Sequence, residues 1–215
     1  MKTNSLSQKK AEILDRNLIY NIGIPRIALM ENAGRRVADC IIEHTKKDDQ
    51  IIIIAGQGYN GGDGLVAGRH LHVEGRCVRV FFIGRKEKAK DETISQLRIL
   101  ERLGVKVQEI TKSKDIKKIT KHVSQARFLI DALLGVGLRG EVRPLAHEII
   151  KYINSSGGKI VSVDIPSGLD VDKGIPLPVA VSADYTVTFQ APKKGMLTSS
   201  GKKFSGEVIV ANIGG

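Results

Sequence analysis

The sequence predicts an α/β fold: a Rossmann-like three-layer sandwich with a mostly parallel central sheet. Strand-length apolar segments alternate with amphipathic helical segments along most of the chain, which is the pattern of βαβ units. The run Ile51-Ile52-Ile53-Ile54 is continuous, β-branched and followed by glycines, as expected for a strand buried on both faces of a parallel sheet. With 215 residues and no repeat or linker, we expect one domain spanning residues 1–215.

Two helices are expected before the isoleucine strand. The first covers residues 7–20, because Asn21 and Gly23 follow it and favour a helix end. The second covers residues 25–43, where Pro25 suits a first helical turn and apolar residues recur at helical spacing. These apolar residues are Met30, Ala33, Val37 and Ile41.

Helices and strands continue to alternate after the isoleucine strand. We expect helices over residues 64–74, 91–103, 115–122 and 143–154, and strands over residues 78–83, 105–108, 128–130 and 160–163. Two last strands, residues 185–189 and 207–213, have no long helix between them. The end of the chain therefore differs in character from the βαβ part.

Composition excludes several protein classes. Hydrophobic residues make up 41% and charged residues 27%, which is ordinary for a globular protein. No apolar run approaches the roughly 18–20 residues of a membrane span, and the N-terminus lacks a secretory signal. Cys40 and Cys77 have neither disulfide nor metal spacing. We therefore expect two free buried thiols, a cytoplasmic location and no membrane partner.

The net charge of +11 attracts phosphate-bearing molecules. Much of the excess comes from lysines between residues 112 and 121, which form the solvated face of a predicted helix. Five Phe, four Tyr and no Trp leave few aromatic side chains for stacking on RNA bases. A nucleotide is therefore the favoured ligand, and a nucleic-acid partner is not expected.

A glycine-rich loop, residues 56–64, follows the isoleucine strand. Its G-x-G-x-x-G spacing comes from Gly56, Gly58 and Gly61. Such glycines let backbone N–H groups approach a phosphate, and the following helix N-terminus favours an anion. The alternative is a tight turn capped by Asp63, but five glycines in nine residues favour a ligand loop. An ordinary dehydrogenase is disfavoured, because the next strand ends in Gly84-Arg85-Lys86 instead of a ribose-binding acid.

Two further strand ends carry polar residues. A second glycine-rich segment, residues 131–141, would wrap a pyrophosphate with Arg139 as charge partner. The alternative is a flexible connection in which Asp131 merely ends the strand. The third segment starts at Asp164, which would act as a general acid or base if burial raised its pKa, or would only organise a turn. No His or Cys accompanies Ser167 in a triad pattern, so a hydrolase nucleophile is disfavoured.

Oxygen-bearing side chains recur at these three strand ends. Asn60, Asp131 and Ser167 would together suit a hard cation such as K⁺ or Mg²⁺. The five histidines show no zinc spacing. We therefore expect a hard-cation site at the carboxyl edge of the sheet.

Longer motifs in the same loops resemble the NAD(P)H-hydrate epimerase family, whose domain is often called the N-terminal YjeF domain. The resemblance covers nearly the whole chain and several motifs in the same order. They are Leu14-Asp15-Arg16, Gly23-Ile24-Pro25, Leu29-Met30-Glu31-Asn32-Ala33-Gly34, Asn60-Gly61-Gly62-Asp63-Gly64, Asp164-Ile165-Pro166-Ser167-Gly168-Leu169, Thr188-Phe189, Ala191-Pro192-Lys193 and Gly195.

The resemblance implies a nucleotide-repair isomerase that interconverts the R and S epimers of hydrated NADH and NADPH, often as a homodimer. It implies one potassium ion per subunit, held by Asn60, Asp131 and Ser167. It also implies a set of substrate contacts. These are Tyr59, Asn60, Gly61, Gly62, Asp63, Gly135, Val136, Gly137, Leu138, Arg139, Gly140, Glu141 and Asp164.

The substrate of this family carries a hydroxyl on the carbon next to the ring nitrogen, so inversion there needs no redox chemistry. We expect Asp164 to be the catalytic acid or base, with Lys193 as second choice. Loss and return of water through an iminium-like cation is the expected route, and ring opening with reclosure competes with it.

Two departures from the family pattern stand out. Tyr59 occupies a position where Asn is common, and Tyr20 replaces an acidic residue of the first helix. The chain also stops where many bacterial relatives continue into a dehydratase domain, which implies functional pairing with a separate ATP- or ADP-dependent dehydratase.

Two other functions remain open at this point. A non-catalytic nucleotide- or RNA-binding scaffold of the same fold is one alternative, since a fold does not guarantee an activity. An NAD(P)-dependent dehydrogenase is the other.

Overall fold

The computed structural model describes residues 5–214. Its α-helices are α1 (Gln8–Arg16), α2 (Arg26–Ile42), α3 (Tyr59–Val73), α4 (Asp91–Arg102), α5 (Lys117–Val123), α6 (Pro144–Asn154) and α7 (Lys202–Ser205). Its strands are β1 (Gln50–Ala55), β2 (Cys77–Ile83), β3 (Lys106–Ile110), β4 (Phe128–Ala132), β5 (Lys159–Val163), β6 (Tyr185–Phe189) and β7 (Glu207–Ala211). A π-helical segment, η1 (Asn17–Asn21), continues α1. All predicted strands and helices are confirmed.

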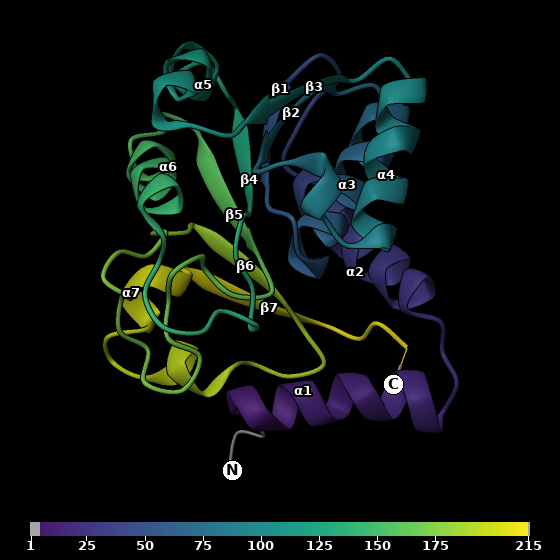
Figure 1. Cartoon of the computed structure of the whole chain (residues 1–215), viewed down its shortest axis with the longest axis vertical. Helices are drawn as coiled ribbons and strands as arrows, with labels where there is room; N and C mark the ends of the chain where they lie inside the picture. Colours follow the sequence, from purple (N-terminus) through teal and green to yellow (C-terminus); the bar gives the residue numbers. More distant parts are fainter. Residues whose placement is uncertain (1–4, 215) are drawn as a thin grey trace.

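The strands form one sheet in the order β3-β2-β1-β4-β5-β6-β7 (Figure 1). Each neighbouring pair is parallel, including β6 and β7 at the end of the chain. The predicted Rossmann-like α/β fold is therefore confirmed. After β1 the chain builds outward through β2 and β3 and then returns to the other side of β1 as β4. In open α/β sheets, ligands bind at such a reversal, outside the carboxyl ends of the strands.

Helices cover both faces of the sheet, with α2, α3 and α4 on one face and α5 and α6 on the other (Figure 1). The isoleucine run in β1 divides between the two cores. Ile51 and Ile53 pack on the α2–α3 side, whereas Ile52 and Ile54 pack on the α5–α6 side. All four side chains are buried, which explains why the run shows no polar alternation.

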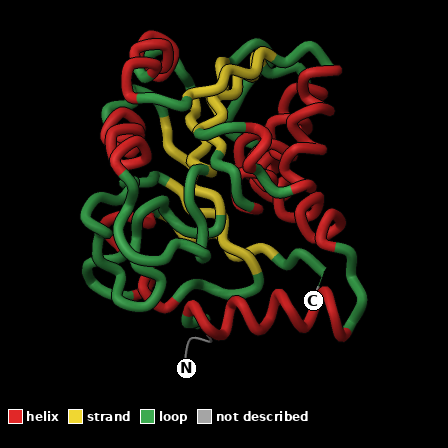
Figure 2. Tube along the Cα trace, in the orientation of Figure 1, coloured by secondary structure: helices red, strands yellow, loops and turns green. Residues whose placement is uncertain are grey.

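Helix α1 lies across the carboxyl end of the sheet instead of on a face (Figures 1 and 2). Ser7 caps it, because its Oγ accepts a hydrogen bond from the backbone N–H of Lys10 at 3.3 Å. The preceding Leu6 pairs as an isolated parallel bridge with Lys193, near the opposite end of the sequence. Gln8 donates through Nε2 to the carbonyl oxygen of Val136 at 2.6 Å. These contacts hold α1 over the strand ends.

Several details differ from the sequence predictions. Helix α3 begins at Tyr59, five residues before the predicted start. Residues 59–64 of the glycine-rich loop therefore belong to the helix, and Asp63 lies inside it and is not its cap. Pro25 is the residue before the first turn of α2. Both cysteines are free. Cys77 is exposed, contrary to the prediction, because it is the first residue of β2. Burial raises the pKa of the Cys40 thiol to about 11.

Within residues 5–214, no helix combines the length and apolar character that crossing a bilayer requires.

Candidate active site

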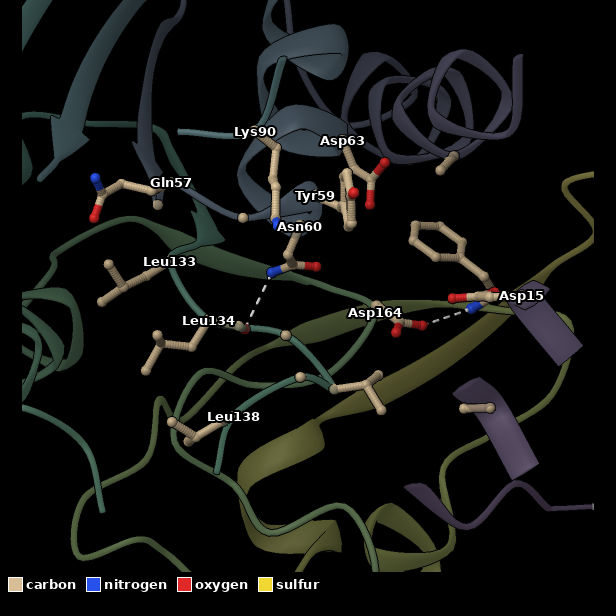
Figure 3. A pocket seen from close by; sticks show the side chains of 18 of the residues that line it. Asp15, Gln57, Tyr59, Asn60, Asp63, Lys90, Leu133, Leu134, Leu138 and Asp164 are labelled. Carbon is tan, nitrogen blue, oxygen red and sulfur yellow. Dashed lines mark hydrogen bonds between the residues drawn. The ribbon is translucent and has the colours of Figure 1, made fainter. Parts of the chain in front are cut away.

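A cavity of about 810 Å³ opens at the reversal between β1 and β4. The segments after β1, β4 and β5 line it from the sheet, and α1 and α2 line it from the other side (Figure 3). Its volume lies within the roughly 300–1,000 Å³ of known small-molecule sites. The three loops that the sequence singled out therefore meet at one cavity.

Close backbone packing explains the glycines after β1. A Cβ atom on Gly56 would overlap the carbonyl oxygen of Leu133, so the segments after β1 and β4 touch directly at this point. A Cβ atom on Gly61 would in turn overlap the carbonyl oxygen of Gly56. Only glycine fits both positions, and the fit brings Asn60 beside the loop that follows β4.

Asp131 lies at the end of β4 and is fully buried. Its carboxylate accepts hydrogen bonds from Ser162 Oγ at 2.8 Å and from the backbone N–H of Ser167 at 2.9 Å. Ser167 Oγ lies 2.6 Å from the same carboxylate, and the N–H of Leu133 lies 3.4 Å away. Asp131 thus ties β4 to β5 and to the loop after β5, and it does more than end a strand.

Two of the three expected cation ligands, Asn60 and Ser167, contact the backbone of Leu134, and Ser167 links them to Asp131. Asn60 donates through Nδ2 to the Leu134 carbonyl at 3.1 Å (Figure 3). Ser167 Oγ lies 3.1 Å from that carbonyl and accepts from the Leu134 N–H at 2.8 Å, while it also contacts Asp131. Figure 3 shows the other amide atom of Asn60, Oδ1, on the side facing away from Leu134.

The chemistry of this group fits a hard cation. Its donors are carboxylate, amide, hydroxyl and carbonyl oxygens, which K⁺ and Mg²⁺ prefer to nitrogen or sulfur. Within the described residues, the carboxylate of Asp131 has hydrogen-bond partners but no cationic one. Burial raises the pKa of Asp131, and its hydrogen bonds oppose that shift. No group of three or more His, Cys, Asp or Glu suited to a metal occurs in residues 5–214.

Asp164 follows β5 in a left-handed conformation, with φ of 65°. Its Oδ1 accepts hydrogen bonds from Lys193 Nζ, from Thr188 Oγ1 at 3.2 Å and from the Phe189 N–H at 3.1 Å. Its Oδ2 has no hydrogen bond to any described residue, and the side chain lines the cavity (Figure 3). Non-glycine residues with positive φ cluster at functional sites, where surrounding contacts hold them.

Lys193 forms a buried ion pair with Asp164. It is only 2% exposed, and it also donates to Thr188 Oγ1 at 3.0 Å and to the Phe189 carbonyl at 3.2 Å. All three partners of its ammonium group are oxygens, so the buried charge is fully satisfied. One oxygen of Asp164 is therefore fixed in place while the other is left for a ligand.

Two further carboxyl groups, Asp15 of α1 and Asp63 of α3, line the same cavity (Figure 3). Burial raises the pKa of Asp63 well above its usual range, and the nearby carboxylates of Asp164 and Asp15 raise it further. The pKa of Asp15 is raised by burial and then by Asp164. Arg26 and Lys193 oppose both shifts. Perturbed carboxyl groups in a cleft are a mark of acid–base sites.

The cavity also has a basic side. The guanidinium carbon of Arg26 lies 4.1 Å from the ring centroid of Tyr59, and Lys90 Nζ lies 5.5 Å from it. Both distances suit cation–π contacts. Lys90 also donates through its backbone N–H to the Gln57 carbonyl at 3.0 Å, which holds it beside the start of α3. A helix N-terminus with two adjacent cations is suited to a phosphate.

Most of the expected substrate contacts line this cavity. They are Tyr59, Asn60, Asp63, Gly135, Val136, Gly137, Leu138, Arg139, Glu141 and Asp164. Gly61, Gly62 and Gly140 are not in its lining, and a Cβ on Gly62 would collide with Met30. Arg139, the expected partner of a phosphate, forms an ion pair with Glu12 of α1.

Sequence reasoning did not select Asp15, Arg26 or Lys90 as site residues, although all three line the cavity. A signal for Asp15 was present in the sequence. It shares one face of the first helix with Ala11, Leu14 and Ile19, which also line the cavity. A carboxylate within an apolar helical stripe indicates an enclosed polar site, but it does not say which cavity the stripe faces.

A profile of the family described as YjeF-related protein N-terminus matches residues 26–195. The chain is 36% identical over 212 residues to the protein named NAD(P)H-hydrate epimerase of Limosilactobacillus fermentum, with 99% of this chain and 98% of that protein covered. A protein of the same name from Oenococcus oeni is 34% identical, with 100% and 98% covered.

Longer relatives and a solved structure match as well. The bifunctional NAD(P)H-hydrate repair enzyme Nnr of Pyrobaculum aerophilum is 37% identical over 98% of this chain, which spans 42% of that protein. The crystal structure of yeast ynu0 superimposes with a TM-score of 0.79 at 28% identity and covers 89% of this chain and 82% of that one.

Proposed function

The chain belongs to the family of YjeF-related protein N-termini, and on that premise we propose that it is an NAD(P)H-hydrate epimerase. This isomerase interconverts the R and S epimers of hydrated NADH and NADPH in nicotinamide nucleotide repair. The supporting observation is that relatives of nearly equal length bear this name and align with 98% of their length. Asp164 lines the cavity with one carboxylate oxygen bound by Lys193 and the other open to a ligand, and it is the acid–base group that the reaction needs.

The reaction breaks and re-forms one carbon–oxygen bond. A proton transferred to the departing hydroxyl lets it leave as water, while the lone pair of the ring nitrogen forms an iminium double bond. Water then adds from the other face and gives up a proton, and the electron pair returns to nitrogen. Asp164 faces this carbon through Oδ2, while Lys193, Thr188 and Phe189 hold its Oδ1 still.

The basic side of the cavity takes the phosphates of the substrate. Arg26 and Lys90 lie beside Tyr59 and the first turn of α3, where backbone N–H groups face the ligand. Asp15 and Asp164 come from α1 and from the segment after β5, so the nucleotide is proposed to lie with its phosphates at the start of α3 and its hydrated ring beside Asp164. The expected contacts from 59–63 and 135–141 border this path.

One K⁺ per subunit is proposed at Asn60, Asp131 and Ser167, together with the Leu134 carbonyl. When bound, it would supply positive charge that orders the loops after β1, β4 and β5. It would also balance the charge of the substrate phosphates. The observation that favours this site is a linked set of four oxygen-bearing groups, one of which is the buried carboxylate of Asp131 that lacks a cationic partner within the described residues.

The chain is proposed to form one domain and to associate as a homodimer. Its proposed location is the cytoplasm. Its relatives named bifunctional repair enzymes are more than twice its length. A separate ATP- or ADP-dependent dehydratase would then act on the same hydrated nucleotides and consume the epimer that this protein supplies.

The test is to mix the protein with the separated R epimer of hydrated NADPH, in the presence of K⁺, and to follow the epimer ratio by chromatography. The proposal expects a faster approach to the R/S equilibrium than in buffer alone. If the folded protein binds the nucleotide without accelerating its epimerisation, it is a binding module. An RNA titration at increasing salt would then identify a polyanion ligand by its steep salt dependence.

A further inference from the structure

We propose that Asp15 of α1 is a second catalytic acid–base residue, which faces the reacting carbon from a different wall of the cavity than Asp164. The inference rests on the proposed epimerase function and deepens it. Asp15 lies on α1, before residues 26–195 that the family profile matches. Its assignment as a catalytic residue comes from the position of α1 at the cavity.

Helix α1 is fixed to the site by contacts with the site's own segments. Gln8 donates through Nε2 to the carbonyls of Val136 at 2.6 Å and Leu138 at 3.2 Å, both in the loop after β4. The N–H of Leu6 donates to the Pro192 carbonyl at 2.9 Å, and the Leu6 carbonyl accepts from the Lys194 N–H at 2.8 Å. The segment that carries Lys193 thus pairs with Leu6, just before α1. These contacts with the loops of the site fix the position of α1 and therefore of Asp15.

Asp15 has no structural partner within the described residues: its carboxyl group makes no hydrogen bond or ion pair there. It shares a helix face with Ala11, Leu14 and Ile19, which also line the cavity. Asp15 is an exposed residue whose carboxyl group lines the cavity without a partner among the described residues, so it is open to a ligand there.

The pKa of Asp15 is raised above its usual value. Burial raises its pKa, and Asp164 and Glu12 raise it further, whereas Lys193 and Arg26 lower it. Asp63, another carboxyl group that lines the cavity, lies on α3. Asp164 differs from Asp15, because a buried ammonium group and two other donors hold its Oδ1 as an acceptor. Two carboxyl groups with opposite environments are the usual basis of an acid–base pair.

The two residues divide the proton transfers. Asp15 gives its proton to the hydroxyl as the carbon–oxygen bond breaks, so water leaves and the nitrogen lone pair forms the iminium bond. A second water adds to the other face of the ring, and Asp164 takes the proton that this water releases. Exchange with solvent then restores both groups. In the reverse direction the protonated Asp164 is the acid and ionised Asp15 is the base, as microscopic reversibility demands.

The experiment compares wild type, Asp15→Asn and Asp39→Asn in the epimer assay across a pH series. Asp39 is a matched control, because it lies on α2 and pairs with Arg35 on the surface. The inference expects Asp15→Asn to lower kcat by about 10²–10³-fold in both directions with little change in KM. It also expects the alkaline limb of the kcat profile to be lost, whereas Asp39→Asn keeps both rate and profile.

Three outcomes are distinguishable. If wild type does not accelerate epimerisation, the proposed function itself fails. If wild type is active and Asp15→Asn retains near-normal kcat, Asp15 is not catalytic. If Asp15→Asn is slow but keeps the alkaline limb, Asp15 has a structural role only, and the inference is overturned. Thermal unfolding of each variant verifies that it is folded, so a loss of rate cannot be a loss of structure.

Discussion

The ends of β4 and β5 lie side by side, and each carries an aspartate in a different environment. Asp131 at the end of β4 is fully buried, and neutral donors surround both of its oxygens. Asp164, just after β5, has one oxygen held by a charged lysine and the other facing the cavity. The same residue type therefore has two different environments one strand apart.

The backbone explains this difference. Asp131 lies inside its strand in register with Ser162, so its side chain points into the packed sheet beside that serine. Asp164 has left its strand and adopts a positive φ, which turns its side chain into the cavity. The difference predicts that Asp131, which stays in register, holds the loops together, and that Asp164, which has left its strand, acts on a ligand. Substitutions of Asp164 and Asp131 test this division, and substitutions of Asp63 and Lys90 test the charges of the cavity. The expected effects decrease in that order.

Asp164→Asn should lower the epimerisation rate by about 10²–10⁴-fold, the usual contribution of general acid–base catalysis. Asparagine keeps an oxygen that can accept from Lys193, Thr188 and Phe189, so the variant should remain folded. Epimer ratios followed by chromatography measure the rate, and circular dichroism verifies the fold. A folded variant with near-normal turnover would remove Asp164 from this role.

Asp131→Ala should instead act on stability. It removes the acceptor for two serine hydroxyls and two backbone N–H groups, which leaves buried donors unsatisfied. We expect a loss of about 3 kcal/mol in the free energy of unfolding, since one unsatisfied buried group costs about 1–3 kcal/mol. Urea unfolding measures it. Ser162→Ala removes one of these bonds and should cost about 1 kcal/mol. Equal stability of Asp131→Ala and wild type would contradict the loop-holding role.

Asp63→Asn should raise the melting temperature by about 2–4 °C at pH 8, the shift that about 1 kcal/mol gives in a chain of this size. The pKa of Asp63 is higher in the folded chain than in the unfolded chain, because burial and the nearby carboxylates disfavour its charge. The folded state therefore loses stability as pH rises through the window above the usual aspartate range. Asparagine removes that loss.

The gain from Asp63→Asn should shrink toward pH 4, where the carboxyl group of wild type is increasingly protonated in both states. Thermal unfolding at pH 4 and pH 8 provides the comparison. A lower melting temperature at pH 8 would mean that Asp63 stabilises the fold through an interaction of its charge.

Lys90→Gln should raise the KM for the hydrated nucleotide by about two- to fivefold, because one exposed charge pair contributes about 0.2–1 kcal/mol. The effect should weaken at high salt, where exposed charges are screened. Lys88→Gln is the matched control, since Lys88 is exposed nearby and does not line the cavity. Steady-state kinetics at two salt concentrations measure both variants. Equal KM values would place the phosphates elsewhere.

The sequence could predict the sheet and the three loops, because a buried isoleucine strand and glycines at strand ends are local signals. It placed the start of α3 too late, since glycines disfavour a helix and conceal one that tertiary packing imposes. It also ranked Lys193 second to Asp164. Asp164 and Lys193 form an ion pair although they lie 29 positions apart, and the residues next to each of them in the sequence do not reveal this contact.

Asp15 was missed for a similar reason. The position of α1 depends on Gln8 reaching the loop after β4 and on Leu6 pairing beside Lys193, both of which are long-range contacts. Local periodicity can identify the apolar face of α1 but not the surface that it covers.

In the proposed reaction, the hydroxyl-bearing carbon of the substrate lies among carboxyl groups, where it loses its hydroxyl as water and then takes up a new water molecule. Epimerisation by the wild-type protein in water enriched in ¹⁸O tests this claim most directly, with mass spectrometry of each separated epimer. The account predicts that every inverted molecule carries one oxygen from the solvent. Inverted product that keeps its original oxygen would contradict it and would favour opening and reclosure of the ring.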